Sequence, residues 1–220
     1  MKRVAVFLLL FVPTLVFSDE KSTVGLQAQA DREVPNDQVL AVVASEEGGR
    51  DPAAIAAVVN RRMTAALAVA REYPAVRARS AGYQTFPVYK DGRIESWRVS
   101  QQLRLESRDF AVMAELLGKL QRELLVRSLT VGLSTEARRA AENALVAEAI
   151  AAFNARAELV RGALKSAGFR IKHIDVGASG APPRPLMQEG VRAMAAAAPS
   201  VEPGTTLVAV SVNGTIELLR

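Results

Sequence analysis

The sequence predicts an α+β protein with a mostly antiparallel sheet and helices packed on one face. Segments in which apolar and polar residues alternate are interspersed with segments whose apolar residues recur every three or four positions. Their order gives two strand-strand-helix units and then a strand-helix-strand-strand C-terminal part. Turn residues separate neighbouring strands, which favours antiparallel pairing with helices on one side of the sheet.

The first unit begins with strands predicted over 24–34 and 38–45, separated by the turn residues Pro35-Asn36-Asp37. Asp51-Pro52 has the pattern of an N-cap followed by proline at the first helical position. The segment after it is predicted to be an amphipathic helix that ends before Pro74. Its inward residues are Ile55, Val59, Met63, Ala66, Ala70 and Tyr73.

The second unit consists of strands over 76–89 and 94–107, joined by a tight Asp-Gly turn at 90–93. A helix follows from 109 to about 123. The second strand alternates between an apolar face and a polar face, which is typical of a sheet covered on one side. Trp97, Val99, Leu103 and Leu105 form the apolar face, and Arg98, Ser100, Gln102, Arg104 and Glu106 form the polar face.

The C-terminal part begins with a strand over 125–133 and an alanine-rich helix over 135–167, with Ser134 as N-cap and Gly168 as its stop. A strand over 169–176 comes next. Residues 178–203 are rich in proline and alanine and are expected to form a connection with one short helix over 188–198. The chain closes on one long strand over 206–219 that is weakened locally at Gly214.

The N-terminal residues 1–18 are typical of a secretory signal peptide. Lys2 and Arg3 precede a 14-residue apolar run, and Val16 and Ser18 provide modest side chains before a cleavage site after Ser18. An uncleaved membrane anchor is the less favoured alternative, because a spanning helix needs about 20 residues. We therefore expect an exported mature protein, with residues 19–220 forming a single domain of two similar lobes.

Composition excludes several kinds of chemistry. The chain has no cysteine, so thiol nucleophiles, thiolate metal sites and disulfides are excluded. Once Lys2 and Arg3 are removed, 26 basic residues face 23 acidic ones. No basic run is longer than a pair of residues, so a nucleic-acid partner is not expected.

Several stretches of the mature chain combine turn residues, helix-packing alanines and alternating strands in a recognisable order. These stretches are Val34-Pro35-Asn36-Asp37, Asn60, Tyr83-Gln84-Thr85, Pro87-Val88-Tyr89, the alanines at 140, 144, 147, 151 and 155, Val201-Glu202-Pro203-Gly204 and Val208-Ala209-Val210-Ser211-Val212. In these residues the chain resembles the SIMPL-domain family, and the likeness covers nearly the whole mature chain.

The resemblance implies a periplasmic protein linked to envelope or oxidative-stress tolerance, with no agreed catalytic activity in the family. At least one relative resembles a ring-shaped oligomer. Two features depart from the family pattern: Leu26-Gln27-Ala28-Gln29-Ala30 replaces a glycine-rich first strand, and Trp97 stands where a tyrosine is usual. These departures bear on inherited surface contacts rather than on the fold.

The polar candidates for a site are sparse. His173 is the only histidine and shares a predicted strand face with Asp175, which suits an exposed pair better than a metal site or proton relay. Glu46 and Glu47 are adjacent on an extended segment and should diverge. Asp51 would repel an anion from the first helix N-terminus. No Gly-x-Ser-x-Gly motif is present. We therefore predict no catalytic, cofactor-binding or metal-binding residues.

The aromatic group on the second pair of strands is the more informative feature. Rings occur on both faces of the predicted hairpin, and they fit either an interaction surface or ordinary packing equally well. The candidate interaction residues are Tyr83, Phe86, Pro87, Tyr89 and Trp97.

Two hypotheses for function follow. In the first, the protein is a non-enzymatic periplasmic module that acts as a homo-oligomer or by binding a protein partner, with no cofactor and no transmembrane segment after signal cleavage. In the second, it is a small-ligand binder or an enzyme of unrecognised type with a diffuse polar site. We favour the first, because the signatures of a nucleophile, a metal or a cofactor are missing from the sequence.

Overall fold

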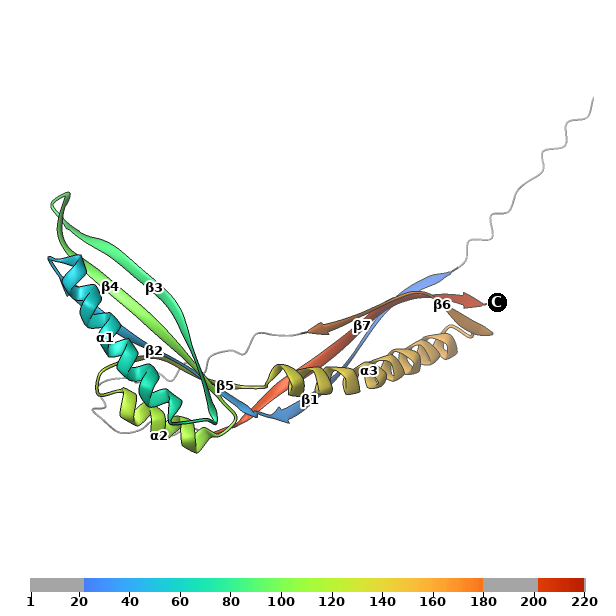
Figure 1. The fold of residues 1–220 in the computed structure, drawn as a ribbon. Helices are drawn as coiled ribbons and strands as arrows, with labels where there is room; N and C mark the ends of the chain where they lie inside the picture. The colour runs from blue at the N-terminus through green and yellow to red at the C-terminus, as the bar shows by residue number, and fades with distance from the viewer. Residues whose placement is uncertain (1–21, 180–201, 220) are drawn as a thin grey trace, which may run out of the picture.

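The computed structural model describes residues 22–179 and 202–219. In these residues the chain forms seven strands in two antiparallel sheets and three helices, so the predicted α+β class is confirmed. The two sheets form two lobes that lie end to end (Figure 1). Helices α1 and α2 accompany one sheet, and helix α3 accompanies the other.

The first lobe contains a four-stranded sheet in the order β3-β4-β2-β5. Its strands are β2 (Gln38–Gly49), β3 (Val76–Lys90), β4 (Arg93–Ser107) and β5 (Leu125–Gly132). Helices α1 (Pro52–Arg71) and α2 (Phe110–Leu120) pack on one face of this sheet. The core between them includes Val43, Met63, Leu103, Leu105, Met113 and Leu117, all at most 2% exposed. The predicted apolar face of the second hairpin strand is therefore the face that the helices cover.

The second lobe contains a three-stranded sheet in the order β1-β7-β6, with β7 in the centre. Its elements are β1 (Thr23–Pro35), α3 (Thr135–Ala163), β6 (Gly168–Ser179) and β7 (Thr205–Leu219). Helix α3 lies along the sheet and buries Leu145, Ala149, Phe153 and Ala157 against the apolar residues of β7. The final strand is one long strand through Gly214, as the sequence predicts.

Local signals define the helix starts. The Asp51 side chain accepts hydrogen bonds from the backbone amides of Ala53 and Ala54, at 2.9 and 3.3 Å. Asp109 caps α2 and Ser134 caps α3 in the same way. An acceptor at this position satisfies amides that have no partner within the helix.

One connection and several element boundaries differ from the prediction. Pro35-Asn36-Asp37 carries the chain from one sheet to the other, since β1 pairs with β7 while β2 pairs with β4 and β5. Helix α2 ends at Leu120 rather than near 123. Helix α3 ends at Ala163 rather than at 167, because Lys165 adopts a positive φ of 52° and Gly168 already belongs to β6.

Two predicted segments lie wholly or largely outside the described residues: the signal peptide at 1–18, and the connection at 178–203 with its short helix. Within the described part, α1 alone is long and apolar enough to cross a membrane by length and composition. Its stripe of Ile55, Val59, Met63, Ala66 and Ala70 is buried against the first lobe's sheet. Core helices of soluble proteins pass the same test, so the observation is weak evidence for a membrane span.

Candidate interaction surfaces

Strands β3 and β4 form a long hairpin that projects from the first lobe. Pairing runs from Val76 opposite Ser107 at the base to Lys90 opposite Arg93 at the tip. The turn residues Asp91 and Gly92 have positive φ values of 48° and 76°, as a tight Asp-Gly turn requires. Strand β2 ends at Gly49, opposite Trp97, so the last residues of the hairpin have no third strand beside them (Figure 1).

Three of the five candidate interaction residues present rings to solvent. Tyr89 is 63% exposed, Tyr83 49% and Phe86 39%, and Ile94 opposite Tyr89 is 49% exposed. Tyr83 lies opposite Gln101 and Phe86 opposite Arg98, which are odd and even positions of β4. Because successive residues of a strand point to opposite faces, rings stand on both sides of the hairpin.

The other two candidates lie at the base of the projecting part. Trp97 is half-buried and packs against a small cluster formed by Ile55, Val59 and Val99. Pro87, also half-buried, lies directly opposite Trp97. Trp97 therefore fixes the hairpin to α1, and the exposed aromatic surface consists of Tyr83, Phe86 and Tyr89.

Strand β3 is also an edge of its sheet. Such an edge carries backbone groups that can pair with another strand. Two features interrupt it: Pro87 lacks a backbone N–H, and a register shift between Ala81 and Tyr83 coincides with the positive φ of 49° at Gly82. Contacts through the exposed rings are therefore better suited to this surface than an uninterrupted strand pairing.

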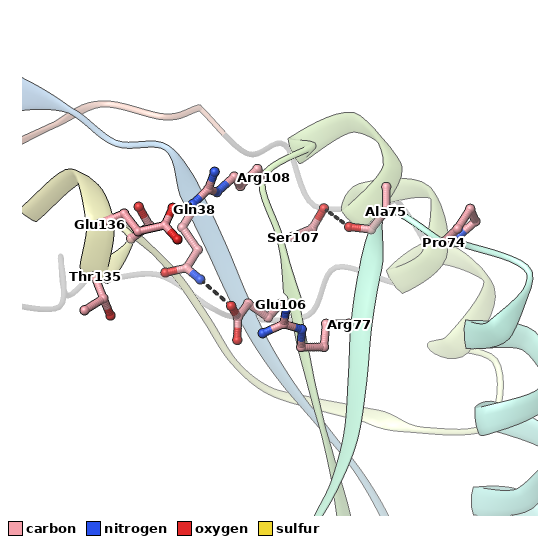
Figure 2. Close-up of a pocket in the computed structure, with 10 residues that line it drawn as sticks. Gln38, Pro74, Ala75, Arg77, Glu106, Ser107, Arg108, Thr135 and Glu136 are labelled. Carbon is pink, nitrogen blue, oxygen red and sulfur yellow. Dashed lines mark hydrogen bonds and ion pairs between the residues drawn. The ribbon is translucent and has the colours of Figure 1, made fainter.

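A polar cleft of about 600 Å³ lies where the two lobes meet. In Figure 2 the strands of the first lobe bring Gln38, Glu106 and Arg77 together, and the start of α3 contributes Thr135 and Glu136. The full lining is Gln38, Pro74, Ala75, Arg77, Glu106, Ser107, Arg108, Ser134, Thr135 and Glu136.

Many of the polar groups of this cleft bind one another. The Nε2 of Gln38 donates to the Oε1 of Glu106 at 2.7 Å, and the Oγ of Ser107 donates to the carbonyl of Ala75 at 2.8 Å (Figure 2). Arg108 forms an ion pair with Glu136. A small ligand would have to compete with these contacts.

Asp37 ties the two lobes together beside this cleft. Its carboxylate accepts hydrogen bonds from the backbone amide and the hydroxyl of Ser134, both at 2.6 Å. Partial burial raises the pKa of Asp37, but the hydrogen bonds from Ser134 and the charge of Arg108 outweigh it, so the pKa lies below its usual value. The ionised carboxylate therefore stabilises the start of α3.

Of the other polar candidates predicted from the sequence, Glu46 and Glu47 form ion pairs, and His173 and Asp175 lie on the second lobe, apart from the cleft. Glu46 forms ion pairs with Arg98 and Arg127, whereas Glu47 pairs with Arg62 of α1, so the two carboxylates diverge as predicted. His173 and Asp175 of β6 line one shallow hollow together with residues of β1 and β7. Among the described residues no group of three or more His, Asp or Glu side chains could hold a metal ion.

Comparison with known protein families gives a match over most of the chain. Residues 24–216 match the SIMPL family, described as a protein of unknown function (DUF541). The chain belongs to the SIMPL family. The resemblance predicted from the sequence is thus confirmed, and it includes both lobes and the junction between them.

Two further comparisons add little about SIMPL-family function. No curated protein matches the chain. Among solved structures, the chain is similar to a putative amidohydrolase/peptidase from Burkholderia cenocepacia, at 15% identity and a TM-score of 0.28. That match covers 51% of this chain and 31% of the other, and a likeness of this size carries no argument about fold or activity.

Proposed function

We propose that this SIMPL-family protein is exported and acts without catalysis, by associating with further copies of itself through the β3–β4 hairpin. In this role it would serve as a scaffold in the periplasm and support tolerance of envelope or oxidative stress. The observation that carries the proposal is the exposure of Tyr83, Phe86 and Tyr89 on a hairpin that extends beyond its neighbouring strand.

Three exposed rings and an exposed isoleucine gather on this one hairpin. Aromatic residues are enriched at protein interfaces because they bury a large area with little loss of side-chain entropy. Tyr89 and Ile94 lie opposite each other near the tip, so their apolar surface is contiguous. A second copy that covers the tip would remove Tyr89 and Ile94 from water together, and it would cover Tyr83 and Phe86 as well only by contacting both faces of the hairpin.

The proposal is tested by measuring the mass of residues 19–220, which contain every described element, by light scattering coupled to size-exclusion chromatography. Phe86→Asp and Tyr89→Asp place a charge within the patch and should reduce the assembly to monomers. Leu159→Asp provides the matched control, because Leu159 is 74% exposed on α3 in the other lobe. That variant should keep the mass of the wild-type protein.

A monomer at every concentration would refute self-association. A wild-type assembly that survives both hairpin substitutions would place the interface elsewhere. If the protein stays monomeric but the hairpin binds a different protein, the function would be binding of a protein partner instead.

The competing proposal is a small polar ligand in the cleft between the lobes, and the cleft's volume of about 600 Å³ is the observation in its favour. Paired groups such as Gln38 with Glu106 and Arg108 with Glu136 weaken this proposal, since their contacts would have to be replaced. Arg77→Gln would lower the affinity for such a ligand and leave the mass in solution unchanged.

A further inference from the structure

The face of the first lobe's sheet that the helices leave open carries five arginines. On β4, Leu103 and Leu105 are buried beneath the helices, so Arg104 and the other even-numbered residues of the strand point to the open side. Directly opposed residues of neighbouring strands share a face, which places the arginines of β3 on the same side. Arg127 of β5 lies at a register irregularity, and its ion pair with Glu46, which is opposite Ser100, places it on this side as well. We name as the arginine face the set Arg77, Arg79, Arg98, Arg104 and Arg127.

Two of these arginines face each other without a counter-charge. Arg79 of β3 lies directly opposite Arg104 of β4 in the antiparallel register, and both side chains are exposed. Within the described part of the chain, no carboxylate is within ion-pair distance of either guanidinium, as the ion pairs of the first lobe involve other residues. Like charges directly opposed in this way destabilise a sheet.

The rest of the face does not neutralise this charge. Glu46 is shared between Arg98 and Arg127, so one carboxylate serves two arginines. Glu106, the other acidic residue of the face, lies opposite Arg77 and accepts a hydrogen bond from Gln38. Five basic groups therefore stand against two acidic ones.

We propose that the arginine face binds an acidic, extended segment of a partner protein. Arginine pairs with carboxylates through two parallel hydrogen bonds, and such pairs would relieve the repulsion between Arg79 and Arg104. Arg77 and Arg79 are two residues apart on β3 and so repeat at about 6.6 Å along the strand. An extended peptide with acidic residues at alternate positions repeats its carboxylates at the same spacing of about 6.6 Å.

The character of the surface fits this occupant. Ser100 and Gln102 stand beside the arginines on β4 and provide hydrogen-bonding groups for a peptide backbone. Electrostatic complementarity of this kind gives strong salt dependence and fast association. Arg98 lies opposite Phe86, but the unpaired arginines Arg79 and Arg104 lie toward the base of the hairpin, away from Tyr89 at its tip, so the proposal does not depend on self-association.

The test uses residues 19–220 and a fluorescent peptide of alternating glutamate and serine, with binding followed by anisotropy at low and at physiological salt. Arg79→Gln combined with Arg104→Gln should weaken binding roughly tenfold at low salt. Arg61→Gln combined with Arg139→Gln removes the same charge from exposed positions on α1 and α3 and should change affinity less than about twofold.

The repulsion between Arg79 and Arg104 also provides a control for loss of structure in the variant. The Arg79/Arg104 double variant should unfold at the same or a higher temperature than the wild-type protein, so lost binding cannot be assigned to lost structure. Equal weakening in both double variants would overturn the proposal, because binding would then reflect net charge alone. Tighter binding of inorganic polyphosphate than of the peptide, with the same dependence on Arg79 and Arg104, would overturn the assignment to an acidic peptide.

Discussion

Replacing Gly214 by alanine should destabilise the second lobe, because a methyl group at this position has no room. A Cβ there would lie 2.6 Å from the carbonyl oxygen of His173 and 2.9 Å from the Cζ of Phe153. Neither neighbour can move easily. The carbonyl belongs to the backbone of β6, which pairs with β7, and the Phe153 ring is fully buried between α3 and the sheet.

The expected magnitude follows from two opposing effects. Overpacking a well-filled core costs about 1–3 kcal/mol. Alanine also reduces the freedom of the unfolded chain, which returns about 0.4–1 kcal/mol. The net loss should therefore be about 1–2 kcal/mol, and for a chain of this length such a loss lowers Tm by about 2–8 °C.

The assay must report on the second lobe. Trp97 lies in the first lobe, so far-UV circular dichroism or calorimetry is the appropriate probe rather than tryptophan fluorescence. Gly25→Ala is the matched control. Gly25 lies on β1, opposite Thr215 of β7, and a Cβ at Gly25 would have nothing within 4 Å. That variant should stay within about 0.5 kcal/mol of wild type. A Gly214→Ala protein as stable as wild type, or a Gly25→Ala protein equally destabilised, would refute the reasoning.

Two further predictions concern the junction and the first lobe. Since the folded-state pKa of Asp37 lies below its unfolded value, the carboxylate stabilises the fold above about pH 4 and loses this effect as pH falls through the folded pKa. Asp37→Asn should therefore lower the free energy of unfolding, measured in urea, by about 1 kcal/mol at neutral pH and by progressively less below about pH 4. A difference between the two proteins that does not change with pH would contradict this. Leu103→Ala, at a fully buried site, should lower the free energy of unfolding by about 2–5 kcal/mol, as followed by Trp97 fluorescence. Leu125→Ala, at a residue 55% exposed on β5 of the same lobe, should cost little by the same probe, and equal losses would contradict the packing described.

Local patterns in the sequence predict the strands and helices well but not the pairing of distant strands. The alternation of apolar and polar residues identifies β1 and β7 as strands. The same alternation would occur with any partner strand, so it does not show that β1 pairs with β7. The structure pairs Thr23 with Glu217, a contact that joins the two ends of the described chain. The residues Pro35-Asn36-Asp37 suit a tight hairpin and a crossover between sheets equally well, so their role depends on these long-range contacts.

The candidate surfaces show the same limit. The sequence places Tyr83, Phe86 and Tyr89 on a hairpin, because the turn and the alternation are local. It does not distinguish Trp97, whose burial depends on how α1 packs over β4. Alternation likewise places Arg104 on the polar face, but the opposition of Arg79 and Arg104 depends on the inter-strand register.

The junction links the surfaces to the architecture. In the described residues the chain passes between the lobes at Asn36-Asp37 and again at Leu133-Ser134, and the two crossings are bonded together. The amide of Asp37 donates to the carbonyl of Gly132 at 3.2 Å, in addition to the two bonds from Ser134 to the Asp37 carboxylate.

Asn36 adds a connection to the start of β7. Its backbone amide donates to the carbonyl of Gly204 at 3.1 Å, and its Nδ2 donates to the carbonyl of Pro203 at 2.7 Å. Adjacent crossings bonded in this way resist bending between the lobes, so the hairpin tip is held at a defined direction from α3 and its sheet (Figure 1). In an assembly in which the hairpin of one copy contacts a different surface of the next, that direction sets the angle between successive copies, and the angle decides whether the assembly closes into a ring or continues as a filament.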